Sequence, residues 1–375
     1  MFFTNPTHFI KSILTNYGGW ETNRKIVVIE SDDWGSIRMP SREIYEKALT
    51  CGYRVDLNEY EKYDTLLTGT DLNKLFEVLS SVKDSKGKPA ILTANCVIAN
   101  PDFKRIEDNK FRDYYSESII ETFKKYNDCL KSFELWKVGM DMDYIQFQFH
   151  AREHVNVSLF MNALQRNDKD VLWGFKHNMP GMIKNGGDKR EPNYYVAATR
   201  FIDIQDMEQK MNIYFEGLNT FQDIFGFKSS TIIPTNYLWN TEYDPKLVSA
   251  GVKGIQGLKV LTNPLTPNII KRRIFGARKY MKFVDLIRNN QLELSLVHNK
   301  KIEVNNCFNK IKYAFLMKKP AIISMHRINF AGGIFEENRI ENLDYFHYLL
   351  TKIVKQWPDV EFVSSDKLVV DILKP

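Results

Sequence analysis

Short apolar and β-branched runs alternate along the chain with longer amphipathic patterns, and this alternation constrains the fold more than any other feature. The strand-like runs are Lys25–Glu30, Ala90–Ile98, Tyr144–Phe149, Ser230–Pro234, Ala321–Met325 and Glu361–Val363. Apolar residues at three-to-four spacing predict helices over Thr70–Val82, Tyr115–Leu130, Ile204–Phe225 and Arg339–Gln356. We therefore expect an α/β fold. Since no Pro-, Gly- or Ser-rich linker divides the 375 residues, we expect a single domain.

The positive charge of the chain is concentrated in one segment. The formal net charge is +6, but residues 269–319 hold thirteen Lys and Arg against three acids, so this segment carries +10 and the rest of the chain −4. A basic surface spread over a whole domain, typical of nucleic-acid-binding proteins, is not predicted. The segment, which includes Arg272 and Arg273, is either a solvated surface or a patch for an anionic partner such as a phosphate-linked glycan, a nucleotide sugar or an acidic membrane.

Cysteine usage and the first residues bear on the compartment. The four cysteines are far apart and form no paired motif, which favours a reducing compartment. No secretory signal pattern and no run of about 18 apolar residues is present, so we expect a cytoplasmic protein without a transmembrane helix. The apolar residues between Phe9 and Leu14 favour a short helix packed on the body, with contact to a membrane surface as the alternative.

Two adjacent carboxylates follow the first strand-like run. The sequence Ser31-Asp32-Asp33-Trp34-Gly35 comes directly after Lys25–Glu30. α/β folds place catalytic groups at the carboxyl ends of their strands. Because neighbouring acids repel, such a pair is typical of a cation site or of a divided acid–base role, although an Asp-rich turn that caps a helix has the same composition.

Two of the seven histidines lie four residues apart after another strand-like run. His150 and His154 follow Tyr144–Phe149 in the sequence HAREH. Side chains with this spacing converge on a helical turn or a curled loop, so both imidazoles are placed to hold one metal ion. With a carboxylate they would form a three-ligand catalytic site; two surface histidines beside Glu153 are the alternative.

Polar groups follow two further strands. His326 comes directly after Ala321–Met325, a position that suits a general acid or base as well as a structural histidine. Pro234-Thr235-Asn236-Tyr237 forms the end of another run and offers a backbone N–H to an oxyanion. Either motif is weak alone, but four strand ends with such groups form a strong combined signal.

The order Asp-Asp, His-x-x-x-His, Pro-x-Asn-Tyr and His resembles that of the polysaccharide deacetylase family, metal-dependent carbohydrate esterases with a distorted (β/α) barrel. The likeness covers scattered motifs over residues 25–370. It implies that Asp32 is the general base, that His326 is the general acid, and that Asp33, His150 and His154 bind the metal. It also implies substrate or oxyanion contacts by Asn236, Tyr237, Trp34 and Arg327.

The activity implied by this resemblance is removal of an acetyl group, N-acetyl in preference to O-acetyl, from a sugar of a surface glycan or of its biosynthetic precursor. The expected cofactor is a divalent metal, and zinc suits a set of two histidines and one aspartate. The expected partner is an acetylated saccharide, with a phosphate-linked form as one option.

The chain departs from the family pattern around the catalytic pair. The Arg that normally orients the catalytic Asp is replaced by Ile232, and the Ser or Thr that usually follows the first His is replaced by Ala151. Arg38, Arg152 and Arg327 are candidates to replace the missing Arg. No acidic partner for the catalytic His is evident, and the long spacing between the first two motifs implies insertions around 51–88 and 101–142.

Other hypotheses stay open. The missing Arg would fit a barrel that has lost activity and only binds glycan, while a related hydrolase would use Asp32 on a glycosidic bond. The sequence from His150 to His154 also matches H-x-x-E-H, the inverted zinc-protease signature, with Glu153 as its base. That signature requires a helix.

Overall fold

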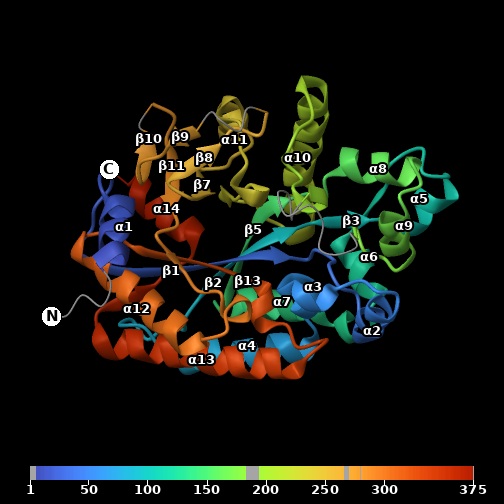
Figure 1. Cartoon of the computed structure of the whole chain (residues 1–375). Helices are drawn as coiled ribbons and strands as arrows, with labels where there is room; N and C mark the ends of the chain where they lie inside the picture. Colours follow the sequence, from blue (N-terminus) through green and yellow to red (C-terminus); the bar gives the residue numbers. More distant parts are fainter. Residues whose placement is uncertain (1–5, 183–193, 266–269, 279, 375) are drawn as a thin grey trace.

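The computed structural model describes residues 6–182, 194–265, 270–278 and 280–374 and has a mixed α/β fold built on a largely parallel sheet (Figure 1). The strands are β1 (Lys25–Trp34), β2 (Leu92–Val97), β3 (Ala99–Pro101), β4 (Ser116–Ser118), β5 (Ile145–Ala151), β6 (Thr231–Ile232), β7 (Gly254–Gly257), β8 (Val260–Thr262), β9 (Ile270–Arg272), β10 (Gly276–Arg278), β11 (Phe283–Ile287), β12 (Asn290–Gln291), β13 (Ala321–His326) and β14 (Val360–Phe362).

The α-helices form layers around the sheet. They are α1 (Pro6–Asn16), α2 (Arg42–Thr50), α3 (Glu59–Tyr63), α4 (Gly69–Ser81), α5 (Phe103–Asp108), α6 (Ile119–Lys124), α7 (Ser132–Asp141), α8 (Val157–Gln165), α9 (Lys169–Lys176), α10 (Ile204–Phe225), α11 (Asp244–Ser249), α12 (Lys300–Leu316), α13 (Glu336–Gln356) and α14 (Ser365–Leu373). In Figure 1, α4, α12 and α13 lie along the lower side, and α10 and α11 along the upper side. Within the described residues, no helix has both the length and the apolar character needed to cross a bilayer.

The main sheet has the order β10-β11-β7-β6-β5-β2-β1-β13-β12, with β14 also paired to β1. Every pairing in it is parallel except that of β10 with β11. Strand β11, next to the edge strand β10, and strand β12, at the opposite edge, are separated in sequence only by Arg288 and Asn289. Arg288 N–H donates to Gly257 O at 2.8 Å, which continues the pairing of β11 with β7. This link carries the chain from one side of the sheet to the other.

The core explains why the strand-like runs pair in this way. Ile26, Val27, Val28 and Ile29 in β1 are all fully buried, and alternate residues belong to two different hydrophobic clusters. A strand covered on both faces is typical of a parallel sheet with helices on each side. The six predicted strands are present, and the helix predicted over Ile204–Phe225 is confirmed with the same bounds.

The helix predicted over Tyr115–Leu130 is wrong. Residues 116–118 instead pair with β3 as strand β4, and a separate short helix, α6, begins at Ile119. The Oγ of Ser118 accepts a hydrogen bond from Glu121 N–H and caps α6. A new helix therefore begins at this point, although the apolar spacing in the sequence runs on without a break. Strands β7 and β11 and helix α12 are additional to the sequence prediction.

Candidate active site

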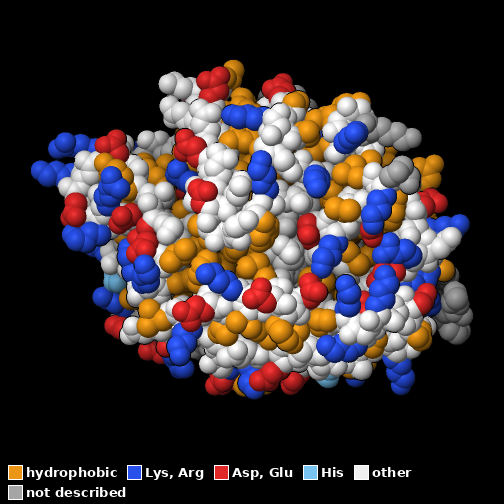
Figure 2. All heavy atoms as spheres, turned by 180° about the vertical axis from the view of Figure 1, so that it is seen from behind, with side chains coloured by type: hydrophobic (Ala, Val, Ile, Leu, Met, Phe, Trp, Pro, Cys, Tyr) orange, Lys and Arg blue, Asp and Glu red, His pale blue; other side chains and the backbone are white. Residues whose placement is uncertain are grey.

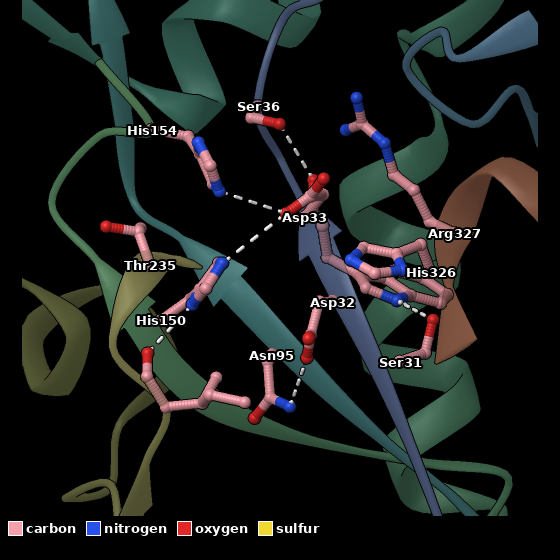
Figure 3. A network of polar contacts seen from close by, with 12 residues as sticks. Ser31, Asp32, Asp33, Ser36, Asn95, His150, His154, Thr235, His326 and Arg327 are labelled. Atoms are coloured by element: carbon pink, nitrogen blue, oxygen red, sulfur yellow. Dashed lines mark hydrogen bonds and ion pairs between the residues drawn. The ribbon is translucent and has the colours of Figure 1, made fainter. Parts of the chain in front are cut away.

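The polar groups predicted at four strand ends converge at the carboxyl edge of the sheet (Figure 3). Asp32 and Asp33 lie at the end of β1, His150 at the end of β5 and His326 at the end of β13. Asp32 is directly opposite His326 in the register of β1 and β13. With Asn236 and Tyr237 after β6, these side chains line a cavity of about 260 Å³.

An irregularity in the backbone makes the adjacent carboxylates of Asp32 and Asp33 point in different directions. The register of β1 against β2 shifts between Ser31 and Trp34, and Asp33 has φ 70°, in the left-handed region that non-glycine residues seldom adopt. Ser36 holds the turn, because its N–H and Oγ both donate to Asp33 O at 3.2 and 3.0 Å. Asp32 and Asp33 can therefore serve different partners although they are neighbours in sequence.

Asp33 and the two predicted histidines form a compact ligand set. Asp33 Oδ1 lies 3.4 Å from His150 Nε2 and 3.2 Å from His154 Nε2, and all three side chains are buried. Three ligands about 2.0–2.1 Å from a tetrahedral ion are about 3.4 Å apart. The spacing of these atoms therefore fits a divalent metal, and Figure 3 shows the Asp33 carboxylate between the two imidazoles.

The donor chemistry of the histidines also fits a metal. His150 Nδ1 lies 2.8 Å from Ile233 O, a contact that holds the proton on Nδ1 and leaves Nε2 as a lone-pair donor. Burial lowers the pKa of His154, which favours its neutral, metal-binding form. Burial raises the pKa of Asp33, but its interactions with His154, His150 and the charged His326 outweigh burial and hold this pKa well below its ordinary value, so its carboxylate is ionised.

Arg288 makes the contact with Asp32 that the resemblance assigned to an Arg at the position of Ile232. Its Nη1 and Nη2 donate to the Oδ2 and Oδ1 of Asp32 at 2.6 and 2.7 Å, and its Nε donates to Glu30 at 2.6 Å. Asn95 Nδ2 donates to Asp32 Oδ1 at 2.8 Å. Burial raises the pKa of Asp32, but Arg288 outweighs burial and the net shift is downward.

None of the three arginines expected to fill this role contacts Asp32. Arg38 bridges Asp33 and Asp64, Arg152 pairs with Glu153, and Arg327 pairs with Asp64. The expectation failed because Arg288 follows β11, a strand inside the basic segment whose apolar run Phe283–Ile287 is interrupted by Asp285. The apolar residues on either side of Asp285 were the only sequence pattern that could have indicated strand β11, and with it the position of Arg288.

Glu293 is the acidic partner of His326 that was not evident in the sequence. Its Oε1 lies 2.6 Å from His326 Nδ1, and its Oε2 accepts from Asn329 Nδ2 at 3.0 Å. Burial lowers the pKa of His326, but Glu293 outweighs burial and raises this pKa to about 10. The histidine is therefore protonated near neutral pH, with Nε2–H available to donate. Since 33 residues separate the pair, no local motif indicates it.

The turn after β6 places one free backbone N–H at the cavity. Asn236 and Tyr237 both have left-handed φ values, 54° and 57°. The N–H of Tyr237 donates to Pro234 O at 3.1 Å, whereas that of Asn236 makes no hydrogen bond within the described part of the chain. The phenol of Tyr237 accepts from Arg288 Nη1 at 3.0 Å. Of the two residues, Asn236 offers the backbone donor and Tyr237 supports Arg288.

Trp34 and Arg327 do not line the cavity, which corrects their expected contact with substrate. Trp34 is fully buried against Trp136 and Phe147, and its Nε1 donates to Ser31 Oγ. Arg327 is 1% exposed and paired with Asp64. The left-handed turn at Asp33 directs the next side chain into the core.

Arg38 and Tyr60 are cavity residues that the motifs did not predict. Arg38 Nη2 donates to Asp33 Oδ2 at 3.2 Å, on the side of the carboxylate away from the histidines. Its guanidinium lies 4.8 Å from the ring centroid of Tyr60, and that ring meets His326 edge-on. Tyr60 belongs to α3, in the segment predicted as an insertion, and no strand-end motif marks it.

The inverted zinc-protease hypothesis fails on its local structure. His150 lies in β5 rather than in a helix. Glu153, the base of that hypothesis, is buried and accepts two hydrogen bonds from Arg152, at 2.5 and 3.0 Å. The two histidines converge through a strand end and the turn after it.

Much of the predicted basic segment is internal structure. Arg273 is 2% exposed and donates to Asp285, Arg278 pairs with Asp285 and Asp244, and Lys319 is buried. Arg288 holds Asp32. Arg272 is exposed, as the patch hypothesis requires; residues 269 and 279 and the side chain of Lys271 lie outside what the structure describes. The formal charge of +10 on residues 269–319 therefore overstates the positive charge that is available to a partner.

Comparison with known proteins gives only distant likenesses. No protein-family model and no curated protein sequence matches the chain. Among solved structures, it is similar to a candidate polysaccharide deacetylase from Mycobacterium smegmatis at 8% identity and TM-score 0.46, with 95% of this chain and 92% of that chain covered. Peptidoglycan deacetylase PdaC from Bacillus subtilis is similar at 10% identity and TM-score 0.38, with 93% and 92% covered. The allantoinase Puue is similar at 11% identity and TM-score 0.44, with 99% and 93% covered. Scores below 0.5 assign no family or activity.

Proposed function

We propose that the protein is a metal-dependent hydrolase that removes an acetyl group, N-acetyl in preference to O-acetyl, from a sugar of a surface glycan or of its precursor. One observation carries the proposal: a ligand set, a carboxylate held by Arg288 and a histidine held by Glu293 line the same cavity. The proposed architecture is a distorted (β/α) barrel of the deacetylase type, joined through Arg288 and Asn289.

Asp33, His150 and His154 are the proposed metal ligands, and zinc suits their two imidazoles and one carboxylate. A divalent ion bound there supplies Lewis acidity, which activates water and polarises the acetyl carbonyl. Arg38 occupies Oδ2 of Asp33, so Oδ1 alone faces the histidines and the carboxylate is arranged to bind through one oxygen.

Asp32 is the proposed general base. It is ionised near neutral pH because Arg288 lowers its pKa, and it lines the cavity beside the ligand set. A carboxylate with a lowered pKa is a weak base, so it accepts a proton efficiently only from a water molecule whose own pKa has been lowered. Arg288 and Asn95 fix its orientation, which reduces the entropy lost when the reacting groups align.

His326 is the proposed general acid, on the opposite side of the cavity from the histidine ligands. It carries the proton that the departing amine or alcohol requires, and Glu293 stabilises its charged form. The free N–H of Asn236 is the proposed donor to the oxyanion of the tetrahedral intermediate. Asp32, His326 and Asn236 thus have separate roles in one acyl transfer to water.

The hypothesis of an inactive glycan-binding barrel loses its main support. It rested on the missing Arg, and Arg288 makes the bidentate contact in its place. The proposed base, ligand set and acid would have no use in a protein that only binds.

The test is an acetate-release assay on N-acetylated and O-acetylated oligosaccharides, with protein reconstituted with Zn²⁺. We expect release from the N-acetylated substrate and loss of both release and stoichiometric metal in Asp33→Ala and His150→Ala. Metal content undiminished in both variants removes the proposed ligand set. Stoichiometric metal in the wild-type protein with no release from any acetylated sugar favours the binding hypothesis.

A further inference from the structure

Two segments of the chain contain no acidic residue. Residues 1–20 have no Asp or Glu, and neither do residues 245–284, which hold nine Lys and Arg. In a chain with 46 acids among 375 residues, an acid-free run of 40 residues is a marked local bias. Segments of this kind attract anionic partners when they reach the surface together.

The fold joins these two segments. Lys259 Nζ donates to the carbonyls of Leu14, Thr15 and Tyr17 at 2.5, 3.2 and 3.1 Å, and so caps the carboxyl end of α1. The N–H of Trp20 donates to Phe275 O at 2.8 Å. In Figure 1, α1 lies beside the region of β8 to β11.

Apolar side chains project outward from both segments. Ile10, Leu14 and Tyr17 are 56%, 63% and 72% exposed. The spacing of Ile10 and Leu14 places them on one face of α1, and Tyr17 follows directly after the helix. The opposite face packs inward, where Ser12 and Asn16 are buried. From the second segment, Ile274 is 63% exposed, and its Cγ2 lies 3.9 Å from where a Cβ on Gly18 would stand.

We call this surface the α1 face and define it by Ile10, Leu14, Tyr17, Leu258, Val260 and Ile274. Leu258 and Val260, on either side of Lys259, are 42% and 38% exposed. Exposed cations lie in the same segments: Lys11 on α1 and Arg272 two residues before Ile274. Seen from behind in Figure 2, basic side chains lie at both sides of the molecule, interspersed with acidic and hydrophobic ones.

We propose that the α1 face docks on an anionic membrane surface. A bilayer interface accepts isolated Ile, Leu and Tyr side chains, and its anionic headgroups complement cations that no neighbouring acid in these segments neutralises. A second copy of the chain fits less well, because two such faces would bring like charges together. The proposal goes beyond the proposed hydrolysis and does not rest on it.

The test is co-sedimentation of the full chain with vesicles of phosphatidylcholine, with or without phosphatidylglycerol. We expect binding to vesicles that contain phosphatidylglycerol, weakened by added salt. The double variant Leu14→Glu/Ile274→Glu should bind at least about ten-fold more weakly, because it removes apolar contact and adds two negative charges. Ile340→Glu is the matched control, since Ile340 is 52% exposed on α13, outside this face, and should bind as the wild type.

Thermal unfolding of each variant separates loss of binding from loss of fold. Failure of the wild-type protein to bind phosphatidylglycerol vesicles overturns the proposal, and so does equal binding by the folded double variant and the wild type. A dimer that the double variant abolishes, without vesicle binding by the wild type, assigns the face to a second copy instead. Acetate release from a soluble oligosaccharide reports on the hydrolase separately.

Discussion

Arg288 donates to both oxygens of Asp32, at 2.6 and 2.7 Å, and with its third nitrogen to Glu30. One guanidinium thus stabilises two buried carboxylates. Only a planar fork with three converging N–H groups can satisfy both at once, so Lys is not an equivalent residue.

Replacing Arg288 should disturb the orientation of the proposed base, Asp32, and leave metal binding unchanged. For Arg288→Lys we expect kcat to fall about 100-fold, because charge is retained but the bidentate contact is lost. Zinc content should stay stoichiometric, since Arg288 contacts none of Asp33, His150 and His154. The measurements are steady-state kinetics on an acetylated oligosaccharide and metal analysis. Arg272→Lys, at an exposed position, is the control; loss of metal in Arg288→Lys would contradict the assigned role.

Removing a metal ligand should abolish activity without unfolding the chain. In His154→Ala we expect the affinity for Zn²⁺ to fall by at least about 100-fold, because one of three protein ligands is lost. Competition with a chromogenic chelator measures the affinity. His347→Ala changes an exposed histidine on α13 and should bind zinc as the wild type does. Equal affinity in His154→Ala would exclude His154 from the site.

The pH profile should report on Glu293. Because Glu293 raises the pKa of His326 to about 10, the wild-type enzyme should keep its general acid until the pH rises through that region. In Glu293→Gln the charged partner is gone, so the histidine loses its proton at lower pH and the alkaline limb of kcat/KM moves downward. An alkaline limb at the same pH in both proteins would assign it to another group.

Stability should distinguish the buried and exposed members of the basic segment. Arg273→Met leaves Asp285 with one cationic partner fewer inside the fold, and we expect a loss of about 3 kcal/mol in the free energy of unfolding. Arg272→Met should change it by no more than about 0.5 kcal/mol, since the side chain is exposed. Urea unfolding measures both. Similar values for the pair would contradict the assigned burial.

The sequence predicted those parts of the site that are local in the chain. Asp33, His150 and His154 follow strands with clear apolar runs, so their convergence at one edge of a parallel sheet was foreseeable. Arg288 and Glu293 were not, because each is brought to its partner by the pairing of distant strands. The predicted compartment, substrate and metal identity stay predictions.

The fold was predicted where strands are long and apolar. β7 and β12 have four and two residues, too few for a periodicity to appear, and β11 contains Asp285. The interruption between β4 and α6 depends on a capping serine rather than on hydrophobic spacing.

The link between β11 and β12 has a consequence for the order in which the site is assembled. All three proposed metal ligands lie within residues 33–154, on strands β1 and β5, which flank β2, and on the turn after β5. Arg288, which holds the proposed base, and His326, the proposed general acid, lie in the last quarter of the chain. During synthesis, the proposed ligands therefore emerge from the ribosome before the groups proposed for proton transfer.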